Sequence, residues 1–203
     1  FFFQAEDGIR DKLVNWSSDV CSSDLGFNME DKKRNILFSQ EQIQTRVKEL
    51  GQQITKDYEG KEVYVLPLLR GSFVFGADIF KALDLKAKVG FMTTSSYGHS
   101  EVSSGTVTIV NDIPDNIEGL DVIIVDDIID TGYTMQFVID HVKKLGAKSV
   151  KTCVLLDKPS RRKVDLKPDY YCFEIDDLFV VGYGLDYEGF YRNVPYVFNW
   201  ENK

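Results

Sequence analysis

Three aspartates and two threonines are concentrated in the stretch VIIVDDIIDTGYTM, residues 122–135. An apolar run leads directly into Asp126 and Asp127, and Asp130 follows before a short run of small and hydroxyl residues. Paired carboxylates at the end of a buried strand can hold a divalent cation or accept hydrogen bonds from ribose hydroxyls. Small and hydroxyl residues at a helix start can surround a phosphate, because backbone N–H groups point at the anion and the helix dipole favours negative charge. The stretch therefore predicts a phosphate site beside a site for a cation or a sugar.

A plainer interpretation of the same stretch is a helix N-cap after a strand, with solvated acids at the turn, since Asp, Thr and Gly are common there. Three acids together with Thr-Gly and a second Thr in one strand-to-helix junction favour the binding site. The stretch also departs from the two common nucleotide-binding patterns, because it contains neither G-x-x-x-x-G-K-[ST] nor G-x-G-x-x-G after a strand.

Polar segments follow other apolar runs as well. Arg70-Gly71-Ser72 follows one run, the polar stretch 95–105 follows a second, and Lys158 follows a third. In parallel α/β sheets, ligands bind beyond the carboxyl ends of the strands, where loops lead into helices. These strand exits are therefore the places where further site residues are expected.

Helical and strand patterns alternate along the chain from Ser39 onward. Ser39 and Gln42 form a capping-box pattern, and apolar residues then recur at spacings of four, three and four, which is typical of one face of a helix. Short apolar runs that alternate with helices indicate parallel β-α-β units and predict an α/β fold. The expected strands are residues 62–69, 88–94, 106–110, 121–125, 150–156, 170–175 and 179–181, and the further helices are residues 73–83 and 134–145.

The composition narrows the class of protein. The chain has 203 residues, of which 43% are hydrophobic and 28% charged, as is ordinary for a soluble globular domain. The formal net charge of -8 argues against binding to duplex nucleic acid, which needs a basic patch. No apolar run approaches the roughly 20 residues of a membrane span. The three cysteines show no CxxC spacing, which argues against a zinc site or a disulfide framework and fits a reducing cytoplasm.

Residues 1–28 differ from the remainder of the chain. They show no sustained periodicity, and the segments FFFQAEDGIRD and SSDVCSSDL resemble translated sequencing-adapter text. We expect residues 1–28 to be a non-native leader, with Met29 as the natural start and residues 29–203 as a single domain. A genuine disordered extension is the alternative.

The stretch 122–135 resembles the phosphoribosyl pyrophosphate motif of the type I phosphoribosyltransferases. Within that group the chain resembles the hypoxanthine-guanine branch from about residue 36 to residue 200. The resemblance implies a mainly parallel twisted sheet flanked by helices, with a small hood subdomain formed by the N- and C-terminal segments. It also implies transfer of the 5-phosphoribosyl group from phosphoribosyl pyrophosphate to hypoxanthine and/or guanine, giving IMP or GMP and pyrophosphate in purine salvage.

The same resemblance implies roles on the sugar side of the site. Asp126 and Asp127 would bind the ribose hydroxyls and Mg²⁺, and Asp130 would act as general base at the purine N7. Arg70 stands where many relatives have Lys, and Tyr133 where some have Lys. Asp126 is Glu in many relatives, which keeps the charge. The implied phosphoribosyl pyrophosphate ligands are Arg70, Gly71, Asp126, Asp127, Asp130, Thr131, Gly132, Tyr133, Thr134 and Arg192.

On the purine side, the resemblance implies that Lys158 donates to the 6-oxo group and that Phe179 stacks on the base. The backbone of Val180 would read the ring edge, and Asp186 would be a base-pocket residue and the second magnesium ligand. Taken alone, Lys158 would be a solvated surface lysine and Phe179 a core residue. Ser96 and Tyr97 begin what resembles the catalytic flexible loop, whose closure would exclude water from the reaction; the plainer interpretation is an ordinary polar hairpin loop.

Two other functions are compatible with this fold. One is a regulatory protein that binds the sugar pyrophosphate or a nucleotide as a signal, and some relatives bind RNA. The other is an enzyme for another base, such as xanthine. The combination of Asp130, Lys158 and the Phe179 segment favours the hypoxanthine-guanine enzyme. The expected partners are small-molecule substrates, with no nucleic acid and no membrane, and the expected assembly is a homodimer or homotetramer in the cytoplasm.

Overall fold

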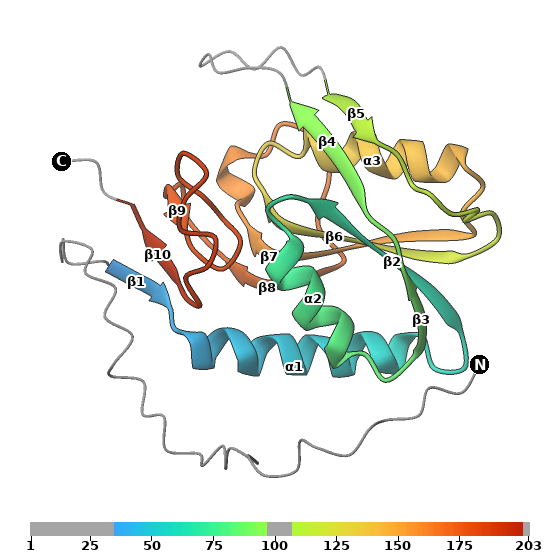
Figure 1. The fold of residues 1–203 in the computed structure, drawn as a ribbon, viewed down its shortest axis with the longest axis horizontal. Coiled ribbons are helices and arrows are strands. Elements are labelled where there is room, and N and C mark those ends of the chain that lie inside the picture. The colour runs from blue at the N-terminus through green and yellow to red at the C-terminus, as the bar shows by residue number, and fades with distance from the viewer. Residues whose placement is uncertain (1–34, 97–106, 201–203) are drawn as a thin grey trace, which may run out of the picture. The chain divides into compact units, whose positions relative to one another are not determined.

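The computed structural model describes residues 35–96 and 107–200, without the side chain of Ser96. Within these ranges the strands form one sheet of seven strands and one of three (Figure 1). The proposed leader, Tyr97 and the loop that follows it lie outside the described residues. None of the helices in the described ranges is long and apolar enough to cross a membrane.

The larger sheet has the strand order β5-β4-β2-β6-β7-β8, and β3 also pairs with β2. Its β2, β6, β7 and β8 are parallel neighbours, whereas β4 and β5 are antiparallel. The α/β fold class with a mainly parallel sheet is therefore confirmed. The bounds are β2 Glu62–Leu69, β3 Lys86–Val89, β4 Met92–Ser96, β5 Val107–Asn111, β6 Asp121–Ile129, β7 Ser149–Asp157 and β8 Tyr170–Glu174.

The parallel register brings the exits of three strands to one edge of the sheet. Pro67 in β2 pairs with Val125 in β6, and Ile129 at the end of β6 pairs with Asp157 at the end of β7. The polar segments that follow β2, β6 and β7 consequently begin beside one another.

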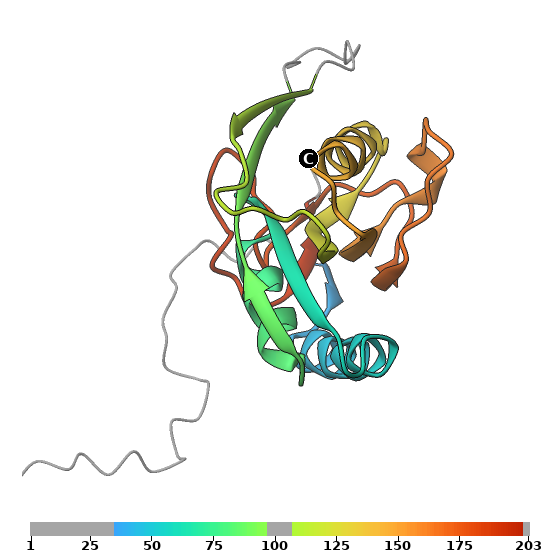
Figure 2. The same ribbon diagram turned by 90° about the vertical axis from the view of Figure 1, so that its right-hand side faces the viewer.

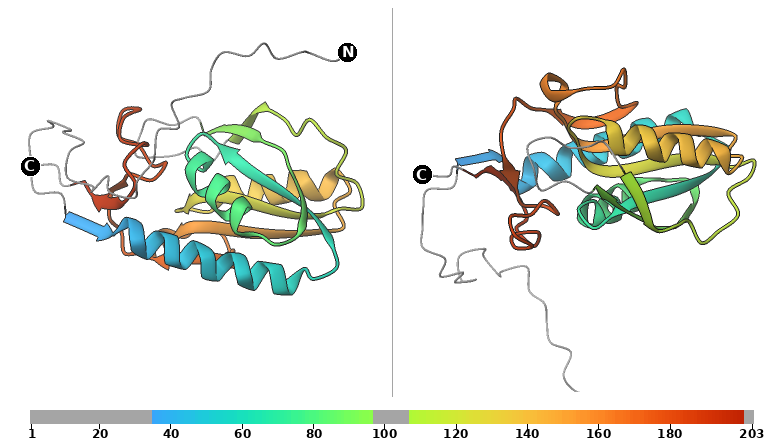
Figure 3. Two further views of the ribbon diagram at one scale, coloured as in Figure 1. Left: turned by 60° about the horizontal axis from the view of Figure 1, so that its bottom comes forward. Right: turned by 90° about the horizontal axis from the view of Figure 1, so that it is seen from above.

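Helices cover both faces of this sheet. The helices α1 (Gln40–Asp57) and α2 (Phe73–Ala82) pack on one face, and α3 (Tyr133–Lys144) packs on the other (Figures 2 and 3). Side chains that alternate along a strand divide between the two cores, because successive residues point to opposite faces. In β2, for example, Val63 and Val65 join the core under α1 and α2, whereas Tyr64 and Leu66 join the core under α3.

The capping box at the start of α1 is confirmed. The backbone N–H of Gln42 donates to Ser39 Oγ at 3.3 Å, and the backbone N–H of Ser39 donates to Gln42 Oε1 at 2.8 Å. Both bonds satisfy donors that a helix start would leave without a partner.

The second sheet has the order β1-β10-β9 and is antiparallel. It joins β1 (Asn35–Phe38) to two segments near the other end of the chain, β9 (Val180–Val181) and β10 (Val197–Asn199). The sequence did not predict β1 or β10, because runs of three or four residues give no clear alternation.

Several predicted boundaries were wrong. Residues 88–94 are not one strand, because Gly90 and Phe91 separate β3 from β4. Gly90 packs against the Tyr64 hydroxyl, where a Cβ would lie 1.7 Å from the oxygen, and its N–H donates to Val65 O. The strand β6 continues to Ile129, so Asp126 and Asp127 lie inside it and Asp130 follows its end. The helix predicted at residues 134–145 runs from Tyr133 to Lys144, and Leu145 after its end is 39% exposed.

Candidate active site

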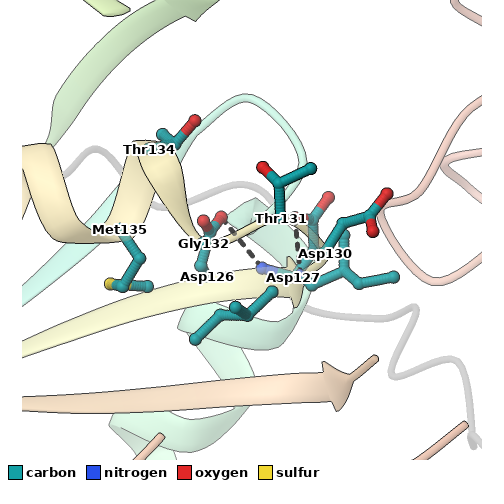
Figure 4. A pocket seen from close by; sticks show the side chains of 9 residues that line it. Asp126, Asp127, Asp130, Thr131, Gly132, Thr134 and Met135 are labelled. Carbon is teal, nitrogen blue, oxygen red and sulfur yellow. Dashed lines mark hydrogen bonds between the residues drawn. The ribbon is translucent and has the colours of Figure 1, made fainter. Parts of the chain in front are cut away.

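The turn between β6 and α3 forms a cavity of about 220 Å³. Figure 4 shows the side chains of Asp126, Asp127, Asp130, Thr131 and Thr134 around it, together with Gly132 and Met135. The first N–H groups of a helix have no partner within it, so the turn that opens α3 can offer them to an anion. The stretch that the sequence predicted to bind a phosphate therefore lines a cavity, and its binding of phosphate stays a prediction.

Gly132 makes this turn possible. Its φ is +88°, in the left-handed region that favours glycine, and it precedes the first residue of α3. A Cβ there would lie 2.6 Å from Val164 Cγ2 and 2.8 Å from Arg162 Cδ. Both the backbone conformation and the close packing therefore require glycine. Tyr133, by contrast, is not among the residues that line the cavity and is 38% exposed.

Asp126 and Asp127 form a carboxylate pair that the protein does not fully neutralise. The backbone N–H of Asp127 donates to Asp126 Oδ1 at 3.0 Å, and that of Ile128 donates to Asp127 Oδ1 at 2.8 Å. Burial, followed by the charge of Asp127, raises the pKa of Asp126 well above its usual range. Burial also raises the pKa of Asp127, although hydrogen bonds and the charge of Arg192 oppose this. A cation beside the pair would stabilise both ionised forms.

Those two acids do not form a complete metal cage. In residues 35–96 and 107–200, no three His, Cys, Asp or Glu side chains gather as a potential metal site. Mg²⁺ typically takes one or two protein carboxylates and completes its shell with water and substrate phosphates. The donor set therefore fits a magnesium ion that binds together with an anionic substrate.

The segment after β2 packs directly against this pair. The Leu69–Arg70 peptide bond in this segment is cis. Gly71 approaches Asp127 so closely that a Cβ at Gly71 would lie 1.8 Å from Asp127 Oδ2. A Cβ at Gly184, whose φ is +102°, would lie 2.2 Å from Gly71 O. Three separate segments therefore meet at Gly71, whose backbone packs against the Asp127 carboxylate and against Gly184.

Arg192 and Asp186 are paired with each other. The Nη2 of Arg192 lies 2.5 Å from Asp186 Oδ1, and its Nη1 donates to Gly184 O. The backbone N–H of Gly189 donates to Asp186 Oδ2 at 2.7 Å. Both oxygens of Asp186 thus have partners, and Asp186 does not join Asp126 and Asp127 in one cluster.

Asp130, in the turn between β6 and α3, has one carboxylate oxygen that is poorly satisfied. Its Oδ1 is buried and accepts no hydrogen bond of good geometry, although Arg161 Nε lies 3.1 Å away. Arg161 also lies 3.4 Å from Asp177. A buried carboxylate oxygen that lacks a well-formed hydrogen bond is unusual in a folded protein.

Lys158 is not a solvated surface lysine. Its side chain is 8% exposed, and Nζ donates to Leu178 O at 2.8 Å and lies 3.6 Å from Asp177. Burial of a charged side chain requires such partners. The ammonium is thereby held next to the segment that leads to Phe179.

Phe179 is not a core residue, because it is 52% exposed and precedes β9. Its ring meets the edge of the Tyr187 ring at 6.0 Å, and Tyr187 stacks on Trp200 at 4.7 Å. Val180 follows it as a buried strand residue. An exposed ring braced by other rings can offer its free surface to a planar ligand.

The sequence did not identify three charged residues that contact the predicted site: Arg161, Arg162 and Asp177. The only available signal was the basic pair after Lys158-Pro159-Ser160 and the acidic pair at residues 176–177. Among the predicted residues, Ser96 lies at the end of β4, and Tyr97 lies outside the described residues.

Comparisons with known proteins identify the family of this chain. Residues 35–188 match the family model of the phosphoribosyl transferase domain. The hypoxanthine-guanine phosphoribosyltransferase of Streptococcus thermophilus is 49% identical over 169 residues, which cover 83% of this chain and 94% of that protein. The Bacillus subtilis protein of the same name is 46% identical over 162 residues, which cover 80% and 90%.

Solved structures that resemble this chain belong to the same class of enzyme. A hypoxanthine-guanine phosphoribosyltransferase from Bacillus anthracis aligns with a TM-score of 0.80 at 45% identity and covers 83% of this chain and 99% of that one. A hypoxanthine phosphoribosyltransferase from Staphylococcus aureus aligns with a TM-score of 0.80 at 41% identity, covering 82% and 91%. The chain belongs to the phosphoribosyltransferase family and, within it, to the hypoxanthine-guanine phosphoribosyltransferases.

Proposed function

We propose that this enzyme transfers the 5-phosphoribosyl group of phosphoribosyl pyrophosphate to hypoxanthine and/or guanine, giving IMP or GMP and pyrophosphate in purine salvage. One observation carries the proposal: a phosphate turn, an adjacent carboxylate pair and a buried lysine meet at one edge of the sheet. Each of the three suits a different part of the two substrates.

The sugar phosphate occupies the turn. Thr131, Gly132, Tyr133 and Thr134 bind the 5'-phosphate through backbone N–H groups and the threonine hydroxyls, while Asp126 and Asp127 accept hydrogen bonds from the ribose hydroxyls. We assign the contact of Tyr133 to its backbone N–H.

Pyrophosphate leaves toward the segment that follows β2 and toward Arg192. Arg70 and Gly71 present backbone N–H groups to it, and Arg192 supplies a fixed positive charge beside Asp127. Asp126 and Asp127 would hold Mg²⁺, which when bound neutralises charge on the departing pyrophosphate. Asp186 would be the ligand of a second ion after its ion pair with Arg192 has rearranged.

The purine lies between Lys158 and Phe179. Phe179 stacks on the ring, the backbone of Val180 reads the ring edge, and Asp186 closes the pocket. The 6-oxo group accepts a hydrogen bond from Lys158, whereas the 6-amino group of adenine offers only donors at that position. Asp130, whose side chain is 38% exposed, takes the N7 proton as the ring nitrogen attacks the anomeric carbon.

Closure of the site completes the mechanism. Ser96 and Tyr97 begin the loop that we assign to closing over the sugar, which would exclude water and suppress hydrolysis. The small sheet β1-β10-β9 is the proposed hood, because β9 directly follows Phe179. We further propose that the enzyme acts in the cytoplasm as a homodimer or homotetramer.

Release of pyrophosphate tests the proposal. The purified protein is supplied with phosphoribosyl pyrophosphate and Mg²⁺, and hypoxanthine, guanine, xanthine, adenine and uracil are added one at a time. We expect release with hypoxanthine, guanine or both. Release with xanthine alone would reassign the base, and binding of the sugar pyrophosphate without release for any base would favour a regulatory protein.

A further inference from the structure

Arg162 is the most extensively bonded side chain near the site, yet it is not part of the cavity lining. It is 11% exposed and forms a buried ion pair with Asp157. Its Nε donates to Asp130 O at 3.0 Å, Nη2 also donates to Ile129 O at 3.4 Å, and Nη1 donates to Leu166 O. All three nitrogens of the guanidinium therefore bind other parts of the chain.

Backbone hydrogen bonds reinforce these contacts. The N–H of Lys158 donates to Ile129 O at 3.0 Å, and the N–H of Lys163 donates to Thr131 O at 2.9 Å. The Cδ of Arg162 lies beneath Gly132, at 2.8 Å from the position that a Cβ would occupy there. Residues 158–163 are therefore hydrogen-bonded to the turn between β6 and α3, residues 129–132, at several points along it.

The bonds of Arg162 join the two halves of the site. One half is the phosphate turn, residues 129–132, which carries Asp130. The other half begins at Asp157, the ion-pair partner of Arg162, and continues directly into Lys158. The guanidinium can bond to both halves because it is planar and rigid and its N–H donors point in several directions.

We propose that Arg162 is a positioning residue that fixes the distance and orientation between Asp130 and Lys158, so that one purine can engage both. The inference rests on the proposed function, since it assigns Arg162 a task in that reaction. Arg162 acts through Asp130 O and Asp157 and does not contact the substrates. Loss of its fork would let the turn and the lysine move independently, and a misplacement of about 1 Å can lower a rate by about 100-fold.

Arg162→Lys is the informative variant. Lysine keeps the positive charge against Asp157, but its single ammonium cannot reproduce the fork that reaches Asp130 O, Ile129 O and Leu166 O. Lys167→Gln is the matched control, because it removes a positive charge from the same segment at an exposed side chain that makes no hydrogen bond or ion pair among the described residues. Both variants are compared with the wild type in melting temperature, kcat, and KM for hypoxanthine and phosphoribosyl pyrophosphate.

We expect Arg162→Lys to lower kcat and kcat/KM together by about 10- to 100-fold while both KM values stay within about threefold, because an interaction that matters only in the transition state has been lost. The control should keep wild-type constants. A purely structural role would instead lower the melting temperature and leave kcat of the folded enzyme unchanged, and this result would overturn the proposal.

Asp157→Asn keeps the test decisive if Arg162→Lys does not fold. The asparagine oxygen still accepts from Arg162, but the charge that holds the guanidinium is gone. We expect a smaller fall in kcat, about 3- to 10-fold, again with little change in KM; an unchanged kcat would overturn the proposal. A wild-type enzyme without transferase activity would refute the proposed function itself, whereas an active wild type with fully active variants would refute only the role of Arg162.

Discussion

Replacing Gly71 with alanine would place a methyl group against the carboxylate of Asp127. The new Cβ would lie 1.8 Å from Asp127 Oδ2 and 2.7 Å from its Cγ. Ordinary contacts begin near 3.4 Å, so the loop and the carboxylate must separate by roughly 1.6 Å before the packing is acceptable. The backbone of Gly71 is not in the left-handed region, so this contact, rather than backbone strain, is the main cost.

Separation of these groups would move the proposed pyrophosphate loop away from the proposed magnesium ligands. A misplacement of about 1 Å can cost about 100-fold in rate, so we expect kcat/KM for phosphoribosyl pyrophosphate to fall by about 100-fold or more. That loss corresponds to about 2.7 kcal/mol of transition-state stabilisation. The assay is initial-rate pyrophosphate release with hypoxanthine at varied phosphoribosyl pyrophosphate, together with a thermal melt.

Gly60→Ala is the matched control. Gly60 has a φ of +73°, and a Cβ there would meet nothing within 4 Å. The substitution should therefore cost about 1 kcal/mol of stability through backbone strain and leave kcat/KM unchanged. If Gly71→Ala keeps kcat/KM within threefold of the wild type, the close approach of Gly71 to Asp127 has no part in binding or catalysis.

Other substitutions test the remaining assignments. Asp130→Asn should lower kcat by about 100-fold or more and spare binding of phosphoribosyl pyrophosphate, measured by calorimetry; full turnover at neutral pH would remove Asp130 as the base. Lys158→Gln should narrow the preference for hypoxanthine over adenine in kcat/KM, because its amide can turn a donor or an acceptor toward the base, and an unchanged preference would contradict the role of Lys158. Chelation of Mg²⁺ should abolish pyrophosphate release and its readdition should restore it; activity that persists in chelator would contradict a magnesium requirement. Ser39→Ala should lower the free energy of unfolding by about 1 kcal/mol without altering kcat, and an unaltered denaturation midpoint would show that the capping box is not stabilising.

The sequence predicted those elements whose signals are local. β2 was predicted with its observed bounds because it is a continuous apolar run, and the start of α1 was predicted because the capping box lies within four residues. β1 and β10 were missed because they are short and pair across most of the chain. The break between β3 and β4 depends on the packing of Gly90 against Tyr64, which no local pattern reveals.

In the candidate site, too, the sequence predicted the features with a local signal and missed those that depend on tertiary packing. The phosphate turn and the acid pair were evident from residues 122–135 because one contiguous stretch carries them. Arg162 was missed because it mainly binds main-chain carbonyls, and those partners leave no trace in residue types. The ion pair of Asp186 with Arg192 and the environment of Lys158 likewise depend on tertiary packing.

A competition experiment tests the central claim most directly. The purified wild-type protein is incubated with phosphoribosyl pyrophosphate, Mg²⁺ and equal amounts of hypoxanthine, guanine and adenine, and the nucleotides formed are separated and identified by mass. The site described above predicts IMP, GMP or both, with AMP at a small fraction of either. Formation of AMP as the main product, or of no nucleotide at all from an intact folded protein, would contradict the assignment of this site to 6-oxopurine transfer.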